Sequence, residues 1–276
     1  MQALSAQLRL QRTRIGLVPT MGALHQGHAS LVTLARQHSD ECVVSIFVNP
    51  SQFGPNEDFA KYPRAFDSDC ALAESAGATV VFAPDAPGMY PPGYNTYVSV
   101  ERLTDGLCGA SRPRHFRGVA TVVLKFFNIV MPDFAVFGQK DAQQVLVLKR
   151  MVEDLNVPVR MMVAPTVREA DGLAMSSRNA YLTPAERAAA PLIYAGLVMA
   201  RQRFEAGERN SVRLAEIVEQ SMSRTPLLKK EYIDIVDMVE LRGLATIASS
   251  ALLAVACRTQ ESTTRLIDNT VLGGEL

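Results

Sequence analysis

The amino-acid sequence predicts an α/β fold, a doubly wound parallel sheet with a smaller α+β C-terminal domain. Short apolar runs alternate with helical patterns from Ile15 to Val163, which is typical of strands joined by crossover helices. Polar clusters that contain glycine follow several of these runs. Beyond about residue 167 an alanine-rich helical segment and three short strand-like runs follow. We therefore expect two domains, residues 1–166 and 167–276.

Composition limits the class of protein. With 276 residues, of which 48% are hydrophobic, the chain can bury one large or two modest cores. Lys plus Arg equals Asp plus Glu at 28 each, so the charge balance points to no nucleic-acid partner and no membrane surface. Four scattered cysteines without a CxxC pair fit reduced thiols in a cytoplasm. No leader-like segment and no apolar run of about 18 residues occurs, so we expect neither secretion nor a membrane span.

The first domain should alternate strands and helices throughout. Pro19 lacks a backbone donor and is expected to end the first strand, and the proline- and glycine-rich segment 84–97 should form a long loop. The expected elements are a short opening helix, strand 15–18, helix 28–38, strand 42–48, helix 63–76, strand 79–82, helix 115–130, strand 134–137, a helix through 155 and strand 159–163.

The second domain should begin with long helices and end with short strands. Thr183 to Glu186 forms a capping box with Pro184 at the first helical position, which predicts one helix running to about Ala206. Asn210 or Ser211 should cap a further helix to about residue 224. Three strands are expected, at 231–237, 251–257 and 265–268.

The stretch His25-Gln-Gly-His28 lies at the entrance of the helix that follows the first strand. A helix N-terminus offers N–H groups and a positive dipole end, which favour a phosphate. Two ordinary alternatives are a glycine turn with two surface histidines, or two ligands of a metal. No Cys or Glu sits at zinc-like spacing nearby, and the balance favours phosphate.

Three more polar clusters follow predicted strands: Asn49-Pro-Ser-Gln52, Gly138-Gln-Lys-Asp141 with Gln144, and Met175-Ser-Ser-Arg-Asn179. Singly, each has an ordinary explanation as a turn starter, a charged first helical turn or a flexible hinge. Together they are more informative, because a doubly wound sheet brings the carboxyl ends of its strands to one edge.

The chemistry of these clusters suits a nucleotide whose α-phosphate is attacked. Cationic and hydroxyl groups could neutralise and bind phosphate oxygens: His25, His28, Lys140, Ser176, Ser177 and Arg178. The amides of Asn49, Gln52 and Gln144 can both donate and accept, which suits a substrate that carries hydroxyls and a carboxylate. Met21 and the apolar face at Val119, Val122 and Val123 could form the pocket walls.

The ordered set of motifs resembles the pantothenate synthetase (pantoate–β-alanine ligase) family over nearly the whole chain. His25 to His28 is similar to the HxGH motif of the wider nucleotidyltransferase superfamily, which includes class I aminoacyl-tRNA synthetases. The motifs are Pro19-Thr-Met-Gly-Ala-Leu-His-Gln-Gly-His28, Val44-Ser-Ile-Phe-Val-Asn-Pro50, His115-Phe-Arg-Gly118, Gly138-Gln-Lys-Asp141 with Gln143-Gln144, Asp171-Gly-Leu-Ala-Met-Ser-Ser-Arg-Asn179 and Arg265-Leu-Ile-Asp-Asn269.

The resemblance implies a Rossmann-like domain and a two-step ligation in the cytoplasm by a homodimer. Pantoate attacks the α-phosphate of ATP, with Mg²⁺ on the phosphates, and β-alanine then displaces AMP from pantoyl adenylate. Catalytic roles fall to His25, His28, Lys140 and Arg178, and the ATP site adds Met21, Gly138, Asp141, Met175, Ser176 and Ser177. Gln52, Gln144, Met21 and Asn49 would bind pantoate. The resemblance also carries over Tyr62, and Asp69 as a neighbour of the magnesium ion.

Some positions depart from the family pattern. Gln139 and Cys108 stand where many members carry Glu, and Cys257 to Thr264 replaces a shorter turn that contains glycine. The turn of the last hairpin therefore does not carry over from the family. Two rivals to the ligase are considered: a nucleotidyltransferase that acts on a phosphorylated acceptor, which should need cations where Gln52 and Gln144 stand, and a nucleotide-binding regulator without turnover.

Overall fold

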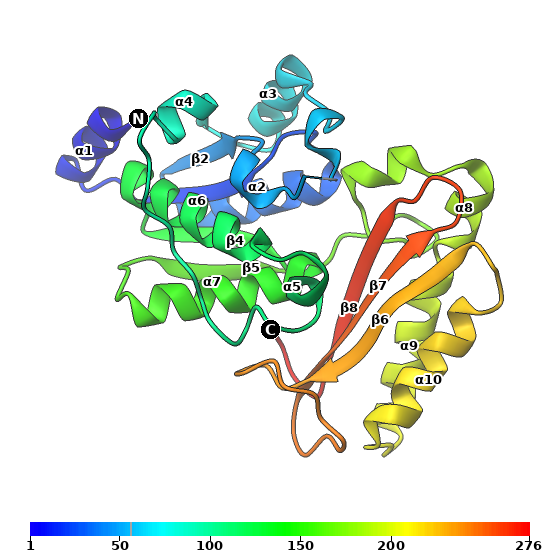
Figure 1. The fold of residues 1–276 in the computed structure, drawn as a ribbon. Coiled ribbons are helices and arrows are strands. Elements are labelled where there is room, and N and C mark those ends of the chain that lie inside the picture. The colour runs from blue at the N-terminus through cyan, green and yellow to red at the C-terminus, as the bar shows by residue number, and fades with distance from the viewer. Residues whose placement is uncertain (56) are drawn as a thin grey trace. The chain divides into compact units, whose positions relative to one another are not determined.

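The structure is a computed structural model that describes residues 1–55 and 57–276 (Figure 1). The chain divides into two compact units. The first contains residues 1–104, 109–138 and 144–165, and the second contains 105–108, 139–143 and 166–276. Two short segments that precede residue 144 thus belong to the second unit. Each unit is described by itself.

A five-stranded parallel sheet forms the centre of the first unit, in the order β3-β2-β1-β4-β5. Its strands are β1 (Ile15–Thr20), β2 (Glu41–Ile46), β3 (Val80–Phe82), β4 (Phe134–Gly138) and β5 (Arg160–Ala164). The strand order reverses between β1 and β4, which is the switch point where doubly wound sheets bind ligands. The doubly wound parallel sheet is confirmed.

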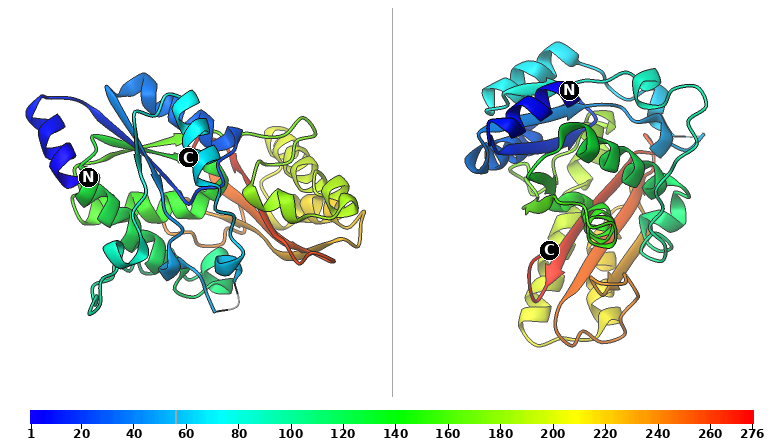
Figure 2. Two further views of the ribbon diagram at one scale, coloured as in Figure 1. Left: turned by 90° about the horizontal axis from the view of Figure 1, so that it is seen from above. Right: turned by 90° about the vertical axis from the view of Figure 1, so that its left-hand side faces the viewer.

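Helices connect these strands and cover both faces of the sheet (Figure 2). Crossovers between parallel strands are right-handed, so crossovers that run in opposite directions across a sheet place their helices on opposite faces. Here the chain runs one way from β1 to β3 and the other way from β3 to β4 and β5. Buried residues of α2 and α3 pack on one face against Val18, Val44 and Val136. The connecting helices are α2 (Gln26–His38), α3 (Phe66–Ser75), α6 (His115–Val130) and α7 (Ala142–Asp154), whose first two residues fall in the second unit.

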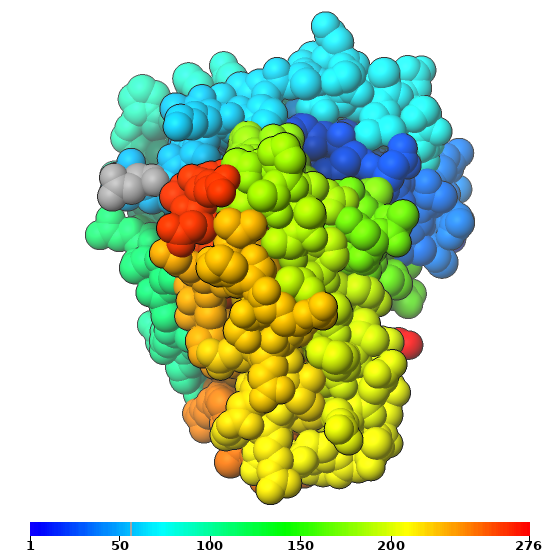
Figure 3. Space-filling model, turned by 90° about the vertical axis from the view of Figure 1, so that its right-hand side faces the viewer, coloured from blue at the N-terminus to red at the C-terminus, as the bar shows by residue number. Residues whose placement is uncertain are grey.

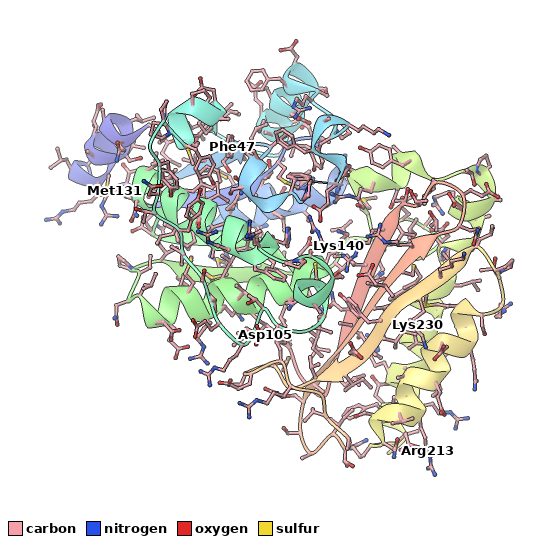
Figure 4. All side chains as sticks on the ribbon, viewed as in Figure 1. Phe47, Asp105, Met131, Lys140, Arg213 and Lys230 are labelled. Atoms are coloured by element: carbon pink, nitrogen blue, oxygen red, sulfur yellow. The ribbon has the colours of Figure 1, made fainter. Side chains whose placement is uncertain are left out.

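Shorter elements complete this part of the chain: α1 (Gln2–Leu10), η1 (Pro50–Gln52), η2 (Asp58–Ala60), α4 (Ala86–Met89) and α5 (Cys108–Ser111). The expected loop 84–97 therefore contains one helical turn. Arg9 of α1 donates a hydrogen bond to the carbonyl of Met131 at 3.0 Å, and Figure 4 shows Met131 beside that helix. Within the described residues, no helix combines the length and apolar character that a bilayer crossing requires.

Most boundaries in the first unit lie within two residues of expectation, and two of the differences concern prolines. Pro19 lies inside β1, in register with Ser45, and does not end the strand. The missing N–H is tolerated because β4 pairs with β1 only at Gly16 and Leu17, so no ladder partner is lost at Pro19. Helix α3 begins at Phe66 and not at Pro63.

The second unit is built on an antiparallel sheet of β6 (Leu228–Val236), β7 (Ala251–Thr259) and β8 (Arg265–Leu272), in that order. Helices α9 (Leu192–Glu205) and α10 (Ser211–Met222) pack together on one face through residues such as Leu197, Leu214 and Leu253. Figure 3 views the side of this unit where α9 and α10 lie in yellow-green and yellow. The expected α+β architecture is confirmed.

The long helix expected from Thr183 to Ala206 is two helices, α8 (Pro184–Ala189) and α9. Pro191 interrupts it, because proline has no N–H to continue the α8 ladder and instead precedes the first turn of α9. Asn210 is the cap of α10 and accepts a hydrogen bond from the Arg213 N–H at 3.1 Å. The remaining elements are η3 (Gln139–Asp141) and η4 (Ser177–Tyr181).

Candidate functional site

The turn between β1 and α2 is held in an unusual conformation. Gly22 and Ala23 both have positive φ, at 84° and 51°, and a non-glycine residue in this region is strained. The Asp69 carboxylate accepts hydrogen bonds from the N–H groups of Ala23 at 2.9 Å and Leu24 at 2.7 Å. Asp69 is only 3% exposed. A buried carboxylate on α3 therefore fixes the turn that carries Met21 and His25.

His25 and His28 cap α2 reciprocally. The Nδ1 atom of His25 accepts from the Gly27 N–H at 3.1 Å, and Nδ1 of His28 accepts from the His25 N–H at 3.3 Å. Their ring centroids lie 4.1 Å apart. Because both Nδ1 atoms accept, a neutral ring at either position carries its proton on Nε2 and is a donor there.

These contacts refine the expectation that backbone N–H groups of the helix would bind a phosphate. The Gly27 N–H is bonded to His25 Nδ1, and the His28 N–H is bonded to the His25 carbonyl at 2.8 Å. Both groups are thus already used inside the turn. What the start of α2 offers an anion is therefore its pair of imidazole rings and its dipole, rather than these two N–H groups.

Three residues expected to bind an acid substrate lie together in the first unit: Met21, Asn49 and Gln52. Gln52 ends η1, and its Nε2 lies 3.0 Å from the sulfur of Met21. Its Oε1 accepts from Asn49 Nδ2 at 3.0 Å. Asn49 and Gln52 are 1% and 9% exposed. Gln144 is partly buried in the first turns of α7, which follows β4, the neighbour of β1.

A pocket of about 370 Å³ borders the same turn. Met21 and Gly22 form one wall, Phe47 and Phe59 contribute apolar surface, and Arg64 and Asp69 contribute charge. Arg64 donates to the carbonyls of Tyr62 and Phe59, at 3.2 and 3.1 Å. Met21 therefore both lines the pocket and contacts Gln52, whereas Gln52 and Gln144 do not line it.

In the second unit, η3 carries the cluster that follows β4 in the chain. The side-chain amide of Asn269 on β8 donates to the carbonyls of Gln139 and Lys140, at 2.9 and 3.0 Å. Gln139 Nε2 in turn donates to Asn269 Oδ1 at 3.3 Å. The Lys140 ammonium, labelled in Figure 4, lies 3.7 Å from the Asp141 carboxylate. Gln139, where many members of the resembled family carry Glu, thus helps to anchor η3 through a neutral amide pair.

The loop with Met175, Ser176, Ser177 and Arg178 is held by charged side chains. Arg168 binds Asp268 of β8 in a bidentate pair with N···O distances of 2.6 and 2.9 Å, and residue 168 forms a bridge with Ala174. Ser176 accepts from the Arg178 N–H at 3.3 Å and caps η4. These contacts argue against the alternative of a flexible hinge at the two serines.

A second ion-pair group holds the tip of this loop. Arg187 of α8 binds both Glu169 and Asp171, at 2.6 and 2.5 Å. The hydrogen bond from Arg187 lowers the pKa of the Asp171 carboxyl. Burial acts in the opposite direction, and the hydrogen bond from the Leu173 N–H lowers the pKa further. Asn179 Nδ2 donates to Glu169 at 2.9 Å and to the Ala174 carbonyl at 3.1 Å. The loop is therefore tied at both its tip and its base.

Several contacts of the site were missed by sequence reasoning. The anchoring role of Asp69 depends on α3 lying against the β1 turn, and the Tyr90 hydroxyl reaches Asn49 at 2.8 Å from a segment predicted only as a loop. Gln143, quoted only as part of a motif, accepts from the Cys108 N–H at 2.9 Å. In the described part of the chain, no group of three or more His, Cys, Asp or Glu side chains could hold a metal ion.

A family model described as pantoate-beta-alanine ligase matches residues 1–271 of the chain. A pantothenate synthetase from Heliobacterium modesticaldum is 57% identical over 266 residues, covering 96% of this chain and 94% of that protein. The crystal structure of pantothenate synthetase from Thermus thermophilus superposes with a TM-score of 0.91 at 45% identity, with 96% of each chain covered. A pantoate-beta-alanine ligase from Francisella tularensis, crystallised with beta-gamma ATP and beta-alanine, has a TM-score of 0.76 at 33% identity, covering 98% of this chain and 93% of that one.

Proposed function

This chain belongs to the pantoate–β-alanine ligase family, and from that premise we propose how its residues divide the work of the reaction. It is an ATP-dependent ligase that condenses pantoate with β-alanine to pantothenate. One observation carries the assignment of roles. A single turn, 21–25, presents Met21 beside Gln52 at one end and begins the His25–His28 cap at the other. The same turn can therefore serve an acid and the phosphate that it attacks.

We infer that the first step joins the carboxylate of pantoate to the α-phosphorus of ATP. The new oxygen–phosphorus bond gives pantoyl adenylate as the bond to pyrophosphate breaks. Negative charge grows on the phosphate oxygens during this step, and fixed donors and cations stabilise it. His25, His28, Lys140, Ser176, Ser177 and Arg178 are assigned to this role.

The nucleotide itself would bind Gly138, Asp141, Met175 and Met21. Gly138 suits this position because it ends β4 at the switch point of the sheet, where a ligand approaches backbone closely. Support for this assignment also comes from the complex of the Francisella relative with an ATP compound.

Pantoate would bind Gln52, Gln144, Asn49 and Met21. In the second step the neutral amine of β-alanine attacks the acyl carbon, AMP leaves, and the amine loses its surplus proton to solvent. Adenylation supplies the leaving group, so the enzyme has mainly to position the amine and exclude water. The half-buried apolar surface around Met21 suits the exclusion of water.

Mg²⁺ is proposed as the ion that ATP brings on its phosphates. Magnesium is commonly held by one or two carboxylates together with substrate phosphates and water, and the described residues fit that mode better than a cage of protein ligands. When bound, the ion would neutralise phosphate charge. The assignment of Asp69 as its neighbour stays a prediction, and two backbone N–H groups already occupy that carboxylate.

We also propose that the enzyme works in the cytoplasm as a homodimer. Support for the compartment comes from the four cysteines, which form no disulfide with one another. Support for the dimer comes from the family resemblance alone, and sedimentation at about twice the chain mass of 30.1 kDa would test it. The balanced net charge gives no reason to add a nucleic acid or a membrane as a partner.

Product analysis tests the proposed function. Purified protein with ATP, Mg²⁺, pantoate and β-alanine should yield pantothenate, AMP and pyrophosphate in equal amounts. A nucleotidyltransferase would instead leave its product bonded to AMP and would need a phosphorylated acceptor. A regulator would bind ATP and leave all substrates unchanged.

A further inference from the structure

Tyr90 lies in the loop after β3 and is joined by hydrogen bonds to the amide of Asn49. Three donors lie within reach of Asn49 Oδ1: the Ser51 N–H at 3.3 Å, the Ser51 hydroxyl at 2.9 Å and the Tyr90 hydroxyl at 2.8 Å. The two hydroxyls also lie 3.0 Å from each other. Asn49 Nδ2 faces the Gly118 carbonyl at 3.1 Å. Since a backbone N–H can only donate and a carbonyl can only accept, the orientation of this amide is fixed from both sides.

This fixed amide also decides how Gln52 is oriented. Asn49 Nδ2 donates to Gln52 Oε1, so the acceptor end of Gln52 is occupied. Its donor end, Nε2, faces the sulfur of Met21 at 3.0 Å. A thioether is a weak acceptor, and an oxygen of a bound acid would form a much better hydrogen bond.

The backbone of Gln52 is clamped separately. His115 Nδ1 lies 2.9 Å from the Gln52 carbonyl, which can only accept, so Nδ1 carries the proton. The His115 Nε2 then accepts from Arg112 at 3.2 Å, and Arg112 is itself paired with Glu57. A side chain at Gly118 would meet the Ser51 carbonyl at 2.4 Å, so only glycine lets α6 approach η1 this closely.

We propose that Tyr90 is a positioning residue for the acid substrate: its hydroxyl holds the Asn49 amide in place, and Asn49 in turn keeps the N–H₂ end of Gln52 facing pantoate. The relay runs from the Tyr90 hydroxyl to Asn49 Oδ1, from Asn49 Nδ2 to Gln52 Oε1, and from Gln52 Nε2 to an oxygen of the substrate. This inference rests on the proposed pantoate-binding role of Gln52. It also gives the His115-Phe-Arg-Gly118 motif a purpose, which is to hold the backbone of the same residue.

The surroundings of Tyr90 suit a permanent donor. Its ring packs against Tyr94 and Phe47, with centroid distances of 5.0 and 6.4 Å. Burial raises the pKa of the Tyr90 phenol to about 12 against the opposing hydrogen bond with Ser51. The hydroxyl therefore keeps its proton over the working pH range, and the relay does not change direction with pH.

The test is a double-mutant cycle on steady-state kinetics. Tyr90→Phe should raise the KM for pantoate about three- to tenfold, the range that one lost hydrogen bond produces, and should change the KM for ATP less than twofold. In a Gln52→Ala background, Tyr90→Phe should raise the KM for pantoate by less than a further twofold, because the side chain that Asn49 positions is then missing. Ser51→Ala removes a second donor to Asn49 Oδ1 and should act in the same direction.

Tyr94→Phe is the matched control, since it removes a hydroxyl from the adjoining ring of the same cluster without touching Asn49. It should leave the KM for pantoate within twofold of the wild-type value. The inference is overturned if Tyr90→Phe leaves that KM unchanged, or raises it equally with and without Gln52. A wild-type protein that forms no pantothenate would contradict the proposed function instead, and the same assay separates the two failures.

Discussion

Among single residues, Asp69 decides whether the turn before α2 keeps its shape. Asp69→Asn leaves one acceptor oxygen for two backbone N–H groups and turns an amide N–H₂ toward one of them. We expect a loss of about 2 kcal/mol in the free energy of unfolding, since hydrogen bonds to charged groups are worth about 1.5–3 kcal/mol. Adenylate formation should fall at least about tenfold as Met21 and His25 lose their positions.

The magnesium dependence of Asp69→Asn separates positioning from metal binding. If the carboxylate only holds the turn, the Mg²⁺ concentration for half-maximal activity should stay within twofold of wild type. A large increase in that concentration would favour the metal assignment. Ala23→Gly is the matched second change: Ala23 has φ of 51°, so glycine should recover about 1 kcal/mol of stability in the Asp69→Asn background.

His28 has two separable tasks, a helix cap and a phosphate donor. His28→Ala should remove the bond from the His25 N–H to Nδ1 and destabilise the fold by about 1 kcal/mol. His28→Gln should restore the cap, because glutamine at this third helical position can reach back to the same N–H. Activity should stay about 100-fold or more below wild type in both variants, since neither alanine nor glutamine places an N–H donor where the imidazole Nε2 lies.

Thermal melting and single-turnover adenylate formation measure these two tasks of His28 independently. A His28→Gln protein with wild-type activity would mean that capping is the whole role of this histidine. A His28→Ala protein that does not fold would point to a structural role larger than one cap.

Among the elements, α8 is joined to the β7–β8 loop of the second unit by Glu186. Its side chain is fully buried, caps α8 with Thr183, and accepts from the N–H groups of Glu261 and Ser262 at 2.7 and 2.9 Å. Burial by itself raises the pKa of Glu186, but the hydrogen bonds from Ser262, Thr183 and Glu261 outweigh it and lower the pKa to about 2. The departure from the family pattern at 257–264 therefore consists of the end of β7 and an ordered loop that Glu186 holds.

The depressed pKa of Glu186 makes its contribution depend on pH. The stabilisation should be complete above the unfolded-state pKa of about 4.5 and should be lost as the pH falls toward 2. Glu186→Gln should cost about 2–3 kcal/mol at pH 7, and the difference from wild type should shrink below pH 4. Denaturant titrations at pH 7 and pH 3.5 check this, and an equal difference at both would contradict it.

Most elements with local causes were predicted well, although Pro191 is an exception, and features with distant causes were not. Helix α6 has the expected bounds because its wide apolar face and the Met131–Pro132 stop lie in the sequence itself. The break at Pro191 was not predicted, because the alanines on both sides favour one continuous helix and the proline was not weighed against them. Pro19 was misread as a strand end because its tolerance depends on where β4 stops pairing.

Across the molecule, the same distinction applies to the site. The polar clusters at strand ends were predictable, because a doubly wound sheet gathers those ends. The groups that orient them were not: Tyr90 is 41 residues from Asn49, and Asp69 is 45 residues from Leu24. Nothing in local periodicity links such pairs, and only packing of the loop after β3 and of α3 brings them together.

Exchange of labelled pyrophosphate into ATP, measured without β-alanine, is the decisive measurement for acyl adenylation by this chain. Reversible adenylation of pantoate predicts rapid exchange that requires both pantoate and the protein, with His28→Ala strongly impaired and added β-alanine drawing the adenylate on to pantothenate. Exchange that proceeds equally without pantoate, or pantothenate formation that releases ADP and phosphate, would contradict the adenylate route.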